Sequence, residues 1–439
     1  MLKRKIEATL EEWQKNANRN PLVVKGCRQC GKTFSVLEFA KTHYKNVVYI
    51  NFFEDSAYRD IFSGSLAVDD LIMYMSAALG RNARFEAGQT CIVLDEIQEC
   101  PNARAALKFF KIDGRFDVIC TGSLLGIKGY KEDPASVPVG YEMQITMFPL
   151  DFEEFLWANG VDDGIIDYLK KCLSAREPVA SAVHGRMRDL LLQYIVVGGM
   201  PAVVNEFVRT RQMDVVLQLQ RNIINAYRDD MLKYAAKEDK SKIRECFDSI
   251  PKQLSKENKK FQYSTIKKGA TSGKFAGSLQ WIEDAGIISR CYNLSIPELP
   301  LDGNALPDVF KVYMADIGLF VSMLEDGTQT DVLLGRLLAY KGAIYENLLA
   351  DFLHKMQRKL YYFRKDSGIE IDFVFRYRGE CVLLECKAKT GNAKSVKTLL
   401  GHPEKYHVKQ AIKLGDYNIG QDRNILTLPL YMGFLLTER

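Results

Sequence analysis

The sequence predicts an α/β protein with a parallel sheet in residues 1–150, a helical middle region and a second α/β region at its C-terminal end. Three observations predict this class. A short apolar run at 21–25 passes through a glycine-containing loop into a helical pattern, a second apolar run at 91–94 ends in two carboxylates, and strand-like runs return after residue 368. Strands that alternate with helices are typical of a parallel sheet covered on both faces.

The composition of the chain further limits the kind of protein it can be. A chain of 439 residues exceeds the size at which one core keeps growing, so we expect several domains. Its 47% hydrophobic and 26% charged residues are ordinary for a folded globular protein and exclude a fibre or a disordered chain. A net charge of +5 permits an anionic partner without requiring one. No apolar run is long enough to cross a bilayer and no signal peptide is evident, so we predict a cytoplasmic protein without membrane contact.

The ten cysteines are scattered, and several lie inside apolar runs, which predicts reduced core thiols and not a disulfide framework. Cys27 and Cys30 have the spacing of a metal or redox pair. No second pair and no nearby histidine accompanies them, so we do not predict a zinc site.

The first apolar run leads into a loop with the pattern G-x-x-x-x-G-K-T, and a helical stretch follows at 34–40. The glycines allow consecutive N–H groups to converge on phosphate oxygens, and the helix N-terminus adds partial positive charge. We expect Lys32 to neutralise the β- and γ-phosphates of ATP and the Thr33 hydroxyl to ligate Mg²⁺. A strand-to-helix turn that matches by chance is the alternative. The predicted nucleotide-binding residues are Gly26, Cys27, Arg28, Gln29, Cys30, Gly31, Lys32 and Thr33.

The second apolar run reads as a parallel strand buried on both faces, with Asp95 and Glu96 at its end. Open α/β sheets bind ligands at this edge. We therefore expect Asp95 to hold the magnesium ion and Glu96 to polarise the attacking water. The next apolar run, at 116–120, ends in two hydroxyl residues, and either Thr121 or Ser123 would lie between the carboxylates and the γ-phosphate. These residues complete a predicted site for ATP hydrolysis.

With these motifs the chain resembles the AAA+ class, and more narrowly a prokaryotic family of ATPases with an uncharacterised C-terminal domain built on a restriction-endonuclease-like core. The resemblance implies a P-loop AAA+ core at 1–150. Family members usually carry a Gly-Arg pair where this sequence has Gly140 and Tyr141, so a γ-phosphate arginine is missing there unless Arg186, Arg188 or Arg228 replaces it. The resemblance spans nearly the whole chain and rests on residues 26–33, 94–98, 121–123, 148–155, 198–201 and 227–230.

The middle of the chain is helical by its apolar spacing, which predicts a helical lid at 151–240 that breaks at Gly198-Gly199. Two short helices and a strand-like run then suggest a winged helix at 241–310. Lys267, Lys268 and Lys274 could meet DNA phosphates there. A packing module with solvated lysines is the alternative, and we favour it because the recognition stretch carries acidic residues.

The C-terminal part, at 311–439, contains two strand-like arms around Arg378-Gly379. With a two-residue turn, Phe373 faces Leu384 on one side of the hairpin and Asp372 faces Glu385 on the other. Facing carboxylates repel each other, which a purely structural hairpin would avoid and a divalent cation would reverse.

This arrangement matches the E/D…E-x-K pattern of the PD-(D/E)xK nuclease superfamily. It predicts that Asp372 and Glu385 hold Mg²⁺, that Lys387 orients or helps to deprotonate the nucleophile, and that Glu346 in an upstream helix supplies the extra acidic residue. A charged solvent face is the alternative, because the pattern is short.

Two functions follow from these predictions. In the first, ATP controls a nuclease-type domain that cleaves or binds DNA. In the second, the chain is an ATP-driven signalling or defence switch whose C-terminal domain is a non-catalytic binding module, acting in a homo-oligomer or with a protein partner. A DNA-binding regulator that uses the winged helix is a third, weaker alternative.

Overall fold

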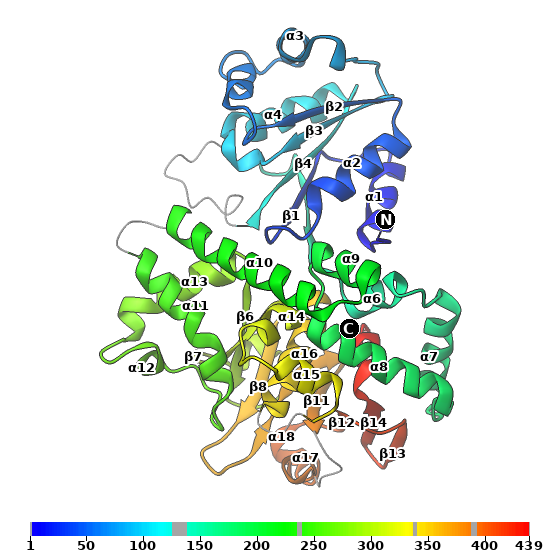
Figure 1. Ribbon diagram of the computed structural model, residues 1–439, viewed down its shortest axis with the longest axis vertical. Helices are drawn as coiled ribbons and strands as arrows, with labels where there is room; N and C mark the ends of the chain where they lie inside the picture. The colour runs from blue at the N-terminus through cyan, green and yellow to red at the C-terminus, as the bar shows by residue number, and fades with distance from the viewer. Residues whose placement is uncertain (1, 125–137, 235–238, 337–339, 388–392, 439) are drawn as a thin grey trace. The chain divides into compact units, whose positions relative to one another are not determined.

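The computed structural model of the protein describes residues 2–124, 138–234, 239–336, 340–387 and 393–438 (Figure 1). The chain divides into two compact units. Unit 1 comprises 3–149 with 284–286, and unit 2 comprises 150–283 and the residues from 287 onward.

Unit 1 is built on a five-stranded sheet with the order β2-β3-β4-β1-β5, in which every pair is parallel. Its central strands are buried on both faces, as the apolar runs predicted. The order places β4 between β1 and β3, so the carboxyl ends of these three strands are neighbours. The strands are β1 (Leu22–Gly26), β2 (Asn46–Asn51), β3 (Thr90–Asp95), β4 (Asp117–Ser123) and β5 (Met143–Met147).

Alternate side chains of these strands belong to two separate apolar clusters. Val24 packs with residues of the first two helices, whereas Val23 packs with residues of the next two. Helices therefore cover both faces of the sheet, and the predicted α/β class is confirmed. The helices are α1 (Ile6–Lys15), α2 (Lys32–His43), α3 (Val68–Leu79) and α4 (Pro101–Asp113).

Unit 2 begins with helices, as predicted for residues 151–240, and three further helices follow. The first begins with a capping box, because Asp151 accepts a hydrogen bond from the N–H of Glu154 and the Glu154 side chain accepts one from the N–H of Asp151. The helices are α6 (Phe152–Ala158), α7 (Asp163–Ala175), α8 (Ser181–Val197), α9 (Pro201–Thr210), α10 (Met213–Tyr234), α11 (Lys240–Leu254), α12 (Tyr263–Ile266) and α13 (Ser272–Asp284).

An antiparallel hairpin of β6 (Ile288–Leu294) and β7 (Ala305–Met314) follows α13. It does not stand alone, because β6 also pairs in parallel with β8 (Leu360–Arg364) in a four-stranded sheet of order β7-β6-β8-β9. The predicted boundary between residues 310 and 311 falls inside β7. The strand-like run that the sequence analysis assigned to a winged helix is therefore β6, which shares a sheet with β8 of the C-terminal part.

The C-terminal part holds a second five-stranded sheet of order β10-β11-β12-β14-β13, in which β11, β12 and β14 are parallel. The remaining elements are α14 (Ile317–Ser322), α15 (Thr328–Leu333), α16 (Lys341–Lys355), β9 (Glu370–Ile371), β10 (Phe373–Tyr377), β11 (Glu380–Lys387), α17 (Lys394–Leu400), α18 (Pro403–Tyr406), β12 (Gln410–Gly415), β13 (Gly420–Asp422), β14 (Ile425–Pro429) and the 3₁₀ helix η5 (Leu430–Leu435).

The hairpin of β10 and β11 has the register predicted from the sequence. Phe373 pairs with Leu384 and Phe375 with Val382. Arg378 and Gly379 form the turn with φ of 52° and 81°, the two left-handed positions that a two-residue hairpin turn requires. The register prediction is therefore confirmed.

Among the described residues, no helix combines the length and the apolar character needed to cross a bilayer.

Candidate functional site

The loop that follows β1 has the backbone of a phosphate cradle. Gln29 and Gly31 adopt left-handed φ of 63° and 94°, and α2 begins at Lys32. A Cβ on Gly26 would lie 2.3 Å from the Met147 carbonyl oxygen, so only glycine allows the loop to begin this close to β5. The Lys32 Nζ folds back over the loop and donates to the carbonyl oxygens of Gly26 at 3.2 Å and Cys27 at 2.9 Å.

Asp95 is the centre of a hydrogen-bond network at the end of β3, and its carboxylate is buried. The Thr33 hydroxyl donates to its two oxygens at 2.9 and 3.1 Å, and the Thr121 hydroxyl also donates to it. Two further donors come from β2: the Tyr49 hydroxyl at 2.9 Å and the Asn51 amide at 3.3 Å. The loop, β2, β3 and β4 thus all contribute to one carboxylate.

Sequence reasoning missed Tyr49 and Asn51. Asn51 pairs with Asp95 across the parallel ladder, and Tyr49 lies two residues earlier on the same face of β2. The polar residues at the end of the apolar run at 46–51 are a signal that could have identified them, but only once β2 was known to lie beside β3.

The other predicted residues of this site lie around Asp95. Glu96 has a left-handed φ of 55°, and its carboxylate accepts a hydrogen bond from the Gln98 amide. Ser123 ends β4 and pairs with Gly26 in the register of β1 and β4. Because β4 lies between β1 and β3, its residues Thr121 and Ser123 lie between β3 and the loop that follows β1.

These residues fit a nucleotide with Mg²⁺. Consecutive loop amides precede a helix N-terminus, and an ammonium group lies above the loop. The adjacent oxygens of Thr33 and Asp95 are the hard ligands that Mg²⁺ prefers.

The arginines considered as replacements for a γ-phosphate arginine have partners in unit 2. Arg188 pairs with Asp416 at 2.7 Å and Arg228 with Asp248 at 2.8 Å. Arg186, like Arg188, is exposed. Gly140 and Tyr141 precede β5 as the sequence places them.

A second group of charged residues surrounds the carboxyl end of β11. Asp372 lies where the chain passes from β9, paired with β8, to β10, paired with β11. Its carboxylate accepts a hydrogen bond from the Cys386 N–H at 2.8 Å. Glu385 is buried on β11 and forms an ion pair through Oε1 with Lys387, which is partly exposed.

The second oxygen of Glu385, Oε2, is buried and has no hydrogen-bond partner among the residues that the structure describes. Burial and the nearby charges of Glu346 and Asp372 make the ionised forms of these acids unfavourable. The pKa of Asp372 is raised well above its ordinary value by burial and by Glu346 and Glu385, and burial also raises the pKa of Glu385. A buried carboxylate oxygen without a donor fits a cation ligand.

Glu346 lies on α16 and is already paired. Its carboxylate forms ion pairs with Lys259 and with Lys311, whose Nζ is 3.4 Å from Oε2, and accepts a hydrogen bond from the Tyr313 hydroxyl at 3.0 Å. Burial opposes its ionisation, but Lys311 and Lys259 outweigh burial and lower the pKa of Glu346 to about 2. Lys311 is completely buried and also pairs with Glu370 at 2.9 Å. The sequence did not reveal either lysine as a partner.

Within the described ranges, no three His, Cys, Asp or Glu side chains form a group that could hold a metal ion. The structure thus brings Asp372, Glu385 and Lys387 together and places Glu346 close enough to influence their charges, but directs Glu346 toward two lysines and a tyrosine.

The lysines considered for DNA contact differ in their surroundings. Lys267 pairs with Glu245 at 2.6 Å and lies over the ring of Phe275, whereas Lys268 and Lys274 are exposed.

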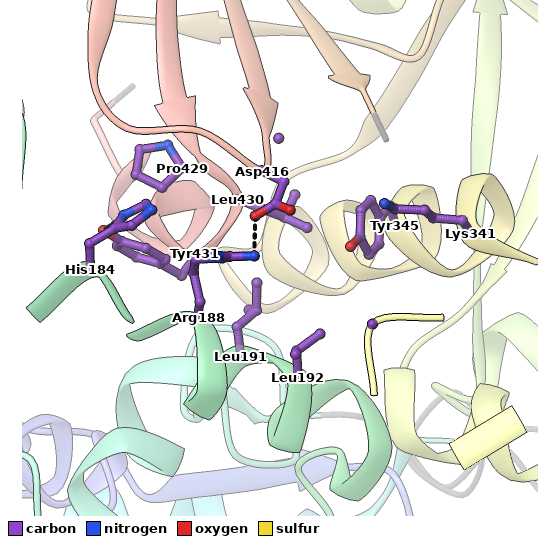
Figure 2. A pocket seen from close by; sticks show the side chains of 12 residues that line it. His184, Arg188, Leu191, Leu192, Lys341, Tyr345, Asp416, Pro429, Leu430 and Tyr431 are labelled. Carbon is purple, nitrogen blue, oxygen red and sulfur yellow. Dashed lines mark hydrogen bonds and ion pairs between the residues drawn. The ribbon is translucent and has the colours of Figure 1, made fainter. Parts of the chain in front are cut away.

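A pocket of about 120 Å³ lies beside the carboxyl end of β12. Figure 2 shows Arg188 pointing into it from α8 toward Asp416, with Lys341 and Tyr345 on α16 at its other side. The pocket also includes Gly415, which pairs with Lys387 in the register of β11 and β12. Its charged lining residues are Arg188, Lys341 and Asp416, the rest of its wall is largely apolar, and at Gly415 it adjoins the strand that carries Lys387.

Three protein families match separate parts of the sequence. Residues 18–156 match a family described as an AAA domain. Residues 188–330 and 341–431 match two domains of unknown function, DUF8612 and DUF4143. No curated protein matches the chain.

Solved structures with similar folds include the Walker-type ATPase paby2304 of Pyrococcus abyssi, at 13% identity and a TM-score of 0.43, covering 74% of this chain and 96% of that one. The Aeropyrum pernix ORC2 protein in its ADPNP-ADP complexes is 12% identical, with a TM-score of 0.36 and coverages of 76% and 92%. The Thermotoga maritima RuvB Holliday junction branch migration motor is 14% identical, with a TM-score of 0.30 and coverages of 65% and 88%. Because these identities are low, the ATPase assignment rests on the family match and on the geometry of the loop.

Proposed function

We propose that the AAA-type ATPase domain of residues 18–156 binds ATP with Mg²⁺ and controls a metal-dependent nuclease site in unit 2 that acts on DNA. The observation that carries the nuclease part is the buried Oε2 of Glu385, which lies beside Asp372 and Lys387 and has no hydrogen-bond partner in the described part of the chain. We also propose a helical lid at 151–240, a winged-helix-like region at 241–310 and a nuclease-like domain at 311–439.

At the ATP site each residue has a defined task. The amides of residues 27–31 donate to the phosphates, and Lys32 leaves the Gly26 and Cys27 carbonyls to neutralise the β- and γ-phosphates. Asp95 and Thr33 would hold Mg²⁺, with the orientation of Asp95 fixed by the donors on β2 and β4. Glu96 orients the attacking water, and Thr121 or Ser123 responds to the γ-phosphate.

At the second site, Asp372 and Glu385 are the acids that would hold the cation. Bound there, Mg²⁺ would polarise the phosphodiester and its water. Lys387 is held by Glu385, and although burial opposes its charge, that carboxylate raises the pKa of the ammonium. A charged Lys387 orients the nucleophile and offsets charge on the phosphate. The unfavourable proximity of the two acids is the physical reason to expect a cation between them.

The pocket beside this site supports a polyanionic substrate. Arg188 and Lys341 line it, and Gly415 pairs with Lys387 in the ladder of β11 and β12. Phosphates of a DNA strand that reaches Lys387 would meet these cations, with Arg188 exchanging its contact with Asp416 for a phosphate.

The test is an assay with labelled single-stranded, duplex and branched DNA, with and without ATP and with Mg²⁺ or Mn²⁺. We expect metal-dependent cleavage that falls at least roughly 100-fold in Glu385→Gln and Lys387→Ala. Glu380→Gln on the same strand, whose side chain is exposed, should keep wild-type activity. Cleavage that persists in both site variants, or a wild-type protein that cuts none of the DNAs, would contradict the nuclease proposal.

A second function is favoured by the surroundings of Glu346. Its carboxylate is satisfied by Lys259, Lys311 and Tyr313, so it has no free oxygen pair for a metal. This arrangement suits a signalling or defence switch whose C-terminal domain binds a partner or a further copy of the chain without cutting DNA. In that case sedimentation velocity should show ATP-dependent assembly that Lys32→Ala removes. Assembly that is identical with and without ATP would count against it.

A further inference from the structure

A pocket of about 240 Å³ lies in unit 2 beside the amino end of β12. It includes Gln410, the first residue of that strand, which pairs with Val382 of β11. Glu385 and Lys387 lie further along β11, and Gly415, the partner of Lys387, ends β12. The pocket is therefore at the end of the sheet opposite the proposed nuclease residues, and it is a different cavity from the one beside Gly415.

Three arginines from separate segments of the chain line this pocket. Arg176 follows α7, Arg378 lies in the turn between β10 and β11, and Arg423 lies in the two-residue turn between β13 and β14. The other polar side chains that line it belong to Gln410, Gln421 and Asn424. No acidic residue is among the described residues of its wall. Like charges gathered on one hollow repel each other, and a bound anion would reverse the sign of that interaction.

The backbone of all three arginines is left-handed, with φ of 60° at Arg176, 52° at Arg378 and 51° at Arg423. Among the described residues four arginines have a left-handed φ, and three of them line this pocket. Glycine and asparagine adopt this conformation more readily, and two-residue hairpin turns favour them at the positions of Arg378 and Arg423. The chain therefore accepts backbone strain at three positions whose guanidinium groups line the same hollow.

Gln421 holds two of the arginines in place. Its Oε1 accepts a hydrogen bond from the Arg176 Nη1, and its Nε2 donates to the Arg423 carbonyl oxygen at 2.8 Å. Arg378 donates through Nη2 to Glu438 at 3.0 Å, but both side chains are more than half exposed, so a phosphate can replace this weak pair. The Arg423 guanidinium has no ion pair or hydrogen bond with any residue that the structure describes. Because each guanidinium carries five N–H donors, the pocket keeps donors available to a ligand.

We propose that this pocket is a phosphate-binding site, in which Arg176, Arg378 and Arg423 bind the phosphate groups of a ligand. A carboxylate offers two oxygens, which one guanidinium fork satisfies, whereas a phosphate offers more acceptor oxygens and more charge. Three guanidinium forks and the amides of Gln410 and Asn424 therefore match phosphate better than carboxylate. The ligand is a free polyphosphate or a nucleic acid strand, because both present this group.

A second hollow of about 520 Å³ adjoins this pocket at Arg423 and Asn424, which line both. Lys397 adds a further cation to it, and Asp422 is its only acidic residue within the described part of the chain. The cationic lining thus continues past the turn between β13 and β14, which favours a ligand with several phosphates in a row over a single phosphate ion. Neither the proposed ATP site nor the proposed nuclease site is needed for this binding, because the pocket contains no residue of either.

The experiment uses the full chain carrying Lys32→Ala, which removes the phosphate site expected in unit 1, in buffer without Mg²⁺. Binding of pyrophosphate is measured by calorimetry, and binding of a labelled single-stranded oligonucleotide by fluorescence anisotropy at several salt concentrations. We expect Arg176→Asn, Arg378→Asn and Arg423→Asn each to weaken the binding of one or both probes by at least roughly tenfold.

The two probes distinguish the sources of the phosphate. A loss confined to pyrophosphate identifies a free polyphosphate as the ligand. A loss of oligonucleotide affinity identifies a nucleic acid strand, and the slope of log affinity against log salt should then become shallower by about one for each arginine removed.

Arg211→Asn is the matched control, because Arg211 also follows a helix, is exposed and has a left-handed φ of 58°, but is not among the described residues that line the pocket. It should leave both affinities unchanged. Since asparagine tolerates the left-handed backbone, none of these variants should melt at a clearly lower temperature. Pocket variants that bind both probes as tightly as the Lys32→Ala protein, or a Lys32→Ala protein that binds neither, overturn this inference. Wild-type protein that binds no Mg²⁺-ATP or cuts no DNA overturns the proposed function and leaves the pocket assignment standing.

Discussion

The position of the Lys32 side chain is set by its hydrogen bonds to the loop. Its ammonium group is buried and donates to two loop carbonyls, so it is positioned over the proposed phosphate site. Replacing those carbonyls with phosphate oxygens strengthens its contacts, because hydrogen bonds between charged groups are the stronger ones.

Lys32→Ala should therefore weaken Mg²⁺-ATP binding by about 100-fold or more in calorimetry. Lys41→Ala is the matched control, because this lysine lies on the same helix but is exposed, and its ion pair is with Glu38 on the surface at 3.6 Å. Similar ATP affinities for the two variants would contradict the assignment of the loop.

The ionisation of a single residue, Glu346, makes the free energy of unfolding depend on pH. Because its folded pKa of about 2 lies below the ordinary 4.5, ionised Glu346 stabilises the fold above pH 4.5, and this contribution is lost as the pH falls toward 2. The difference between these two pKa values corresponds to about 3 kcal/mol in the free energy of unfolding.

We expect Glu346→Gln to lower the melting temperature at pH 7 and to reduce its fall between pH 5 and pH 3, measured by calorimetry. Glu380→Gln, which is exposed, should leave the profile unchanged. Wild-type and Glu346→Gln profiles that run parallel would show that the ion pairs with Lys259 and Lys311 do not couple to folding.

At the scale of elements, close backbone approaches join the end of α8 to α14 and to Leu150, the residue just before the N-cap of α6. A Cβ on Gly199 would lie 2.0 Å from the Leu150 carbonyl oxygen, and one on Gly318 would lie 2.5 Å from the Val197 carbonyl oxygen. The Gly199 N–H also donates to Asp316 at 2.7 Å. The glycine break after α8 is therefore a packing requirement of unit 2 and not only a turn.

Gly199→Ala should destabilise the protein by more than about 3 kcal/mol, because the backbone must shift to remove the clash. Gly185→Ala is a control on α8 itself, since nothing lies within 4 Å of its added Cβ. That variant should be neutral or more stable by up to about 1 kcal/mol, because alanine favours the helix. Equal thermal shifts for the two variants would refute the close approach.

At the scale of the whole molecule, unit 2 is tied together by a buried charged network. Lys355 on α16 contacts Asp351 at 2.8 Å, Asp316 at 3.5 Å and the Leu150 carbonyl oxygen at 3.0 Å, and the Tyr194 hydroxyl donates to Asp351 at 2.8 Å. Each of the three family-matched segments contributes a residue to it. The middle and C-terminal parts therefore share one interior.

Lys355→Met would leave two buried carboxylates without their cation, which typically costs about 3–5 kcal/mol. Differential scanning calorimetry should show the transition of unit 2 at a clearly lower temperature. Lys359→Met should have almost no effect, because Lys359 is exposed and its pair with Asp302 is on the surface. A small shift in Lys355→Met would mean that the network adds little to stability.

The sequence by itself determined the local elements. A strand, a G-x-x-x-x-G-K-T loop and a helix follow from neighbouring residues, and the register of β10 and β11 follows from alternation and a two-residue turn. These features depend on short-range geometry, so periodicity and turn chemistry were sufficient to predict them.

Only the tertiary structure decided which distant groups meet. Tyr49 and Asn51 reach Asp95 because β2 lies beside β3, and β6 joins β8 across a long stretch of chain. Glu346 is held by Lys259 and Lys311, which no local pattern connects to it. Strand order and burial create these contacts, and both arise from the packing of the whole unit.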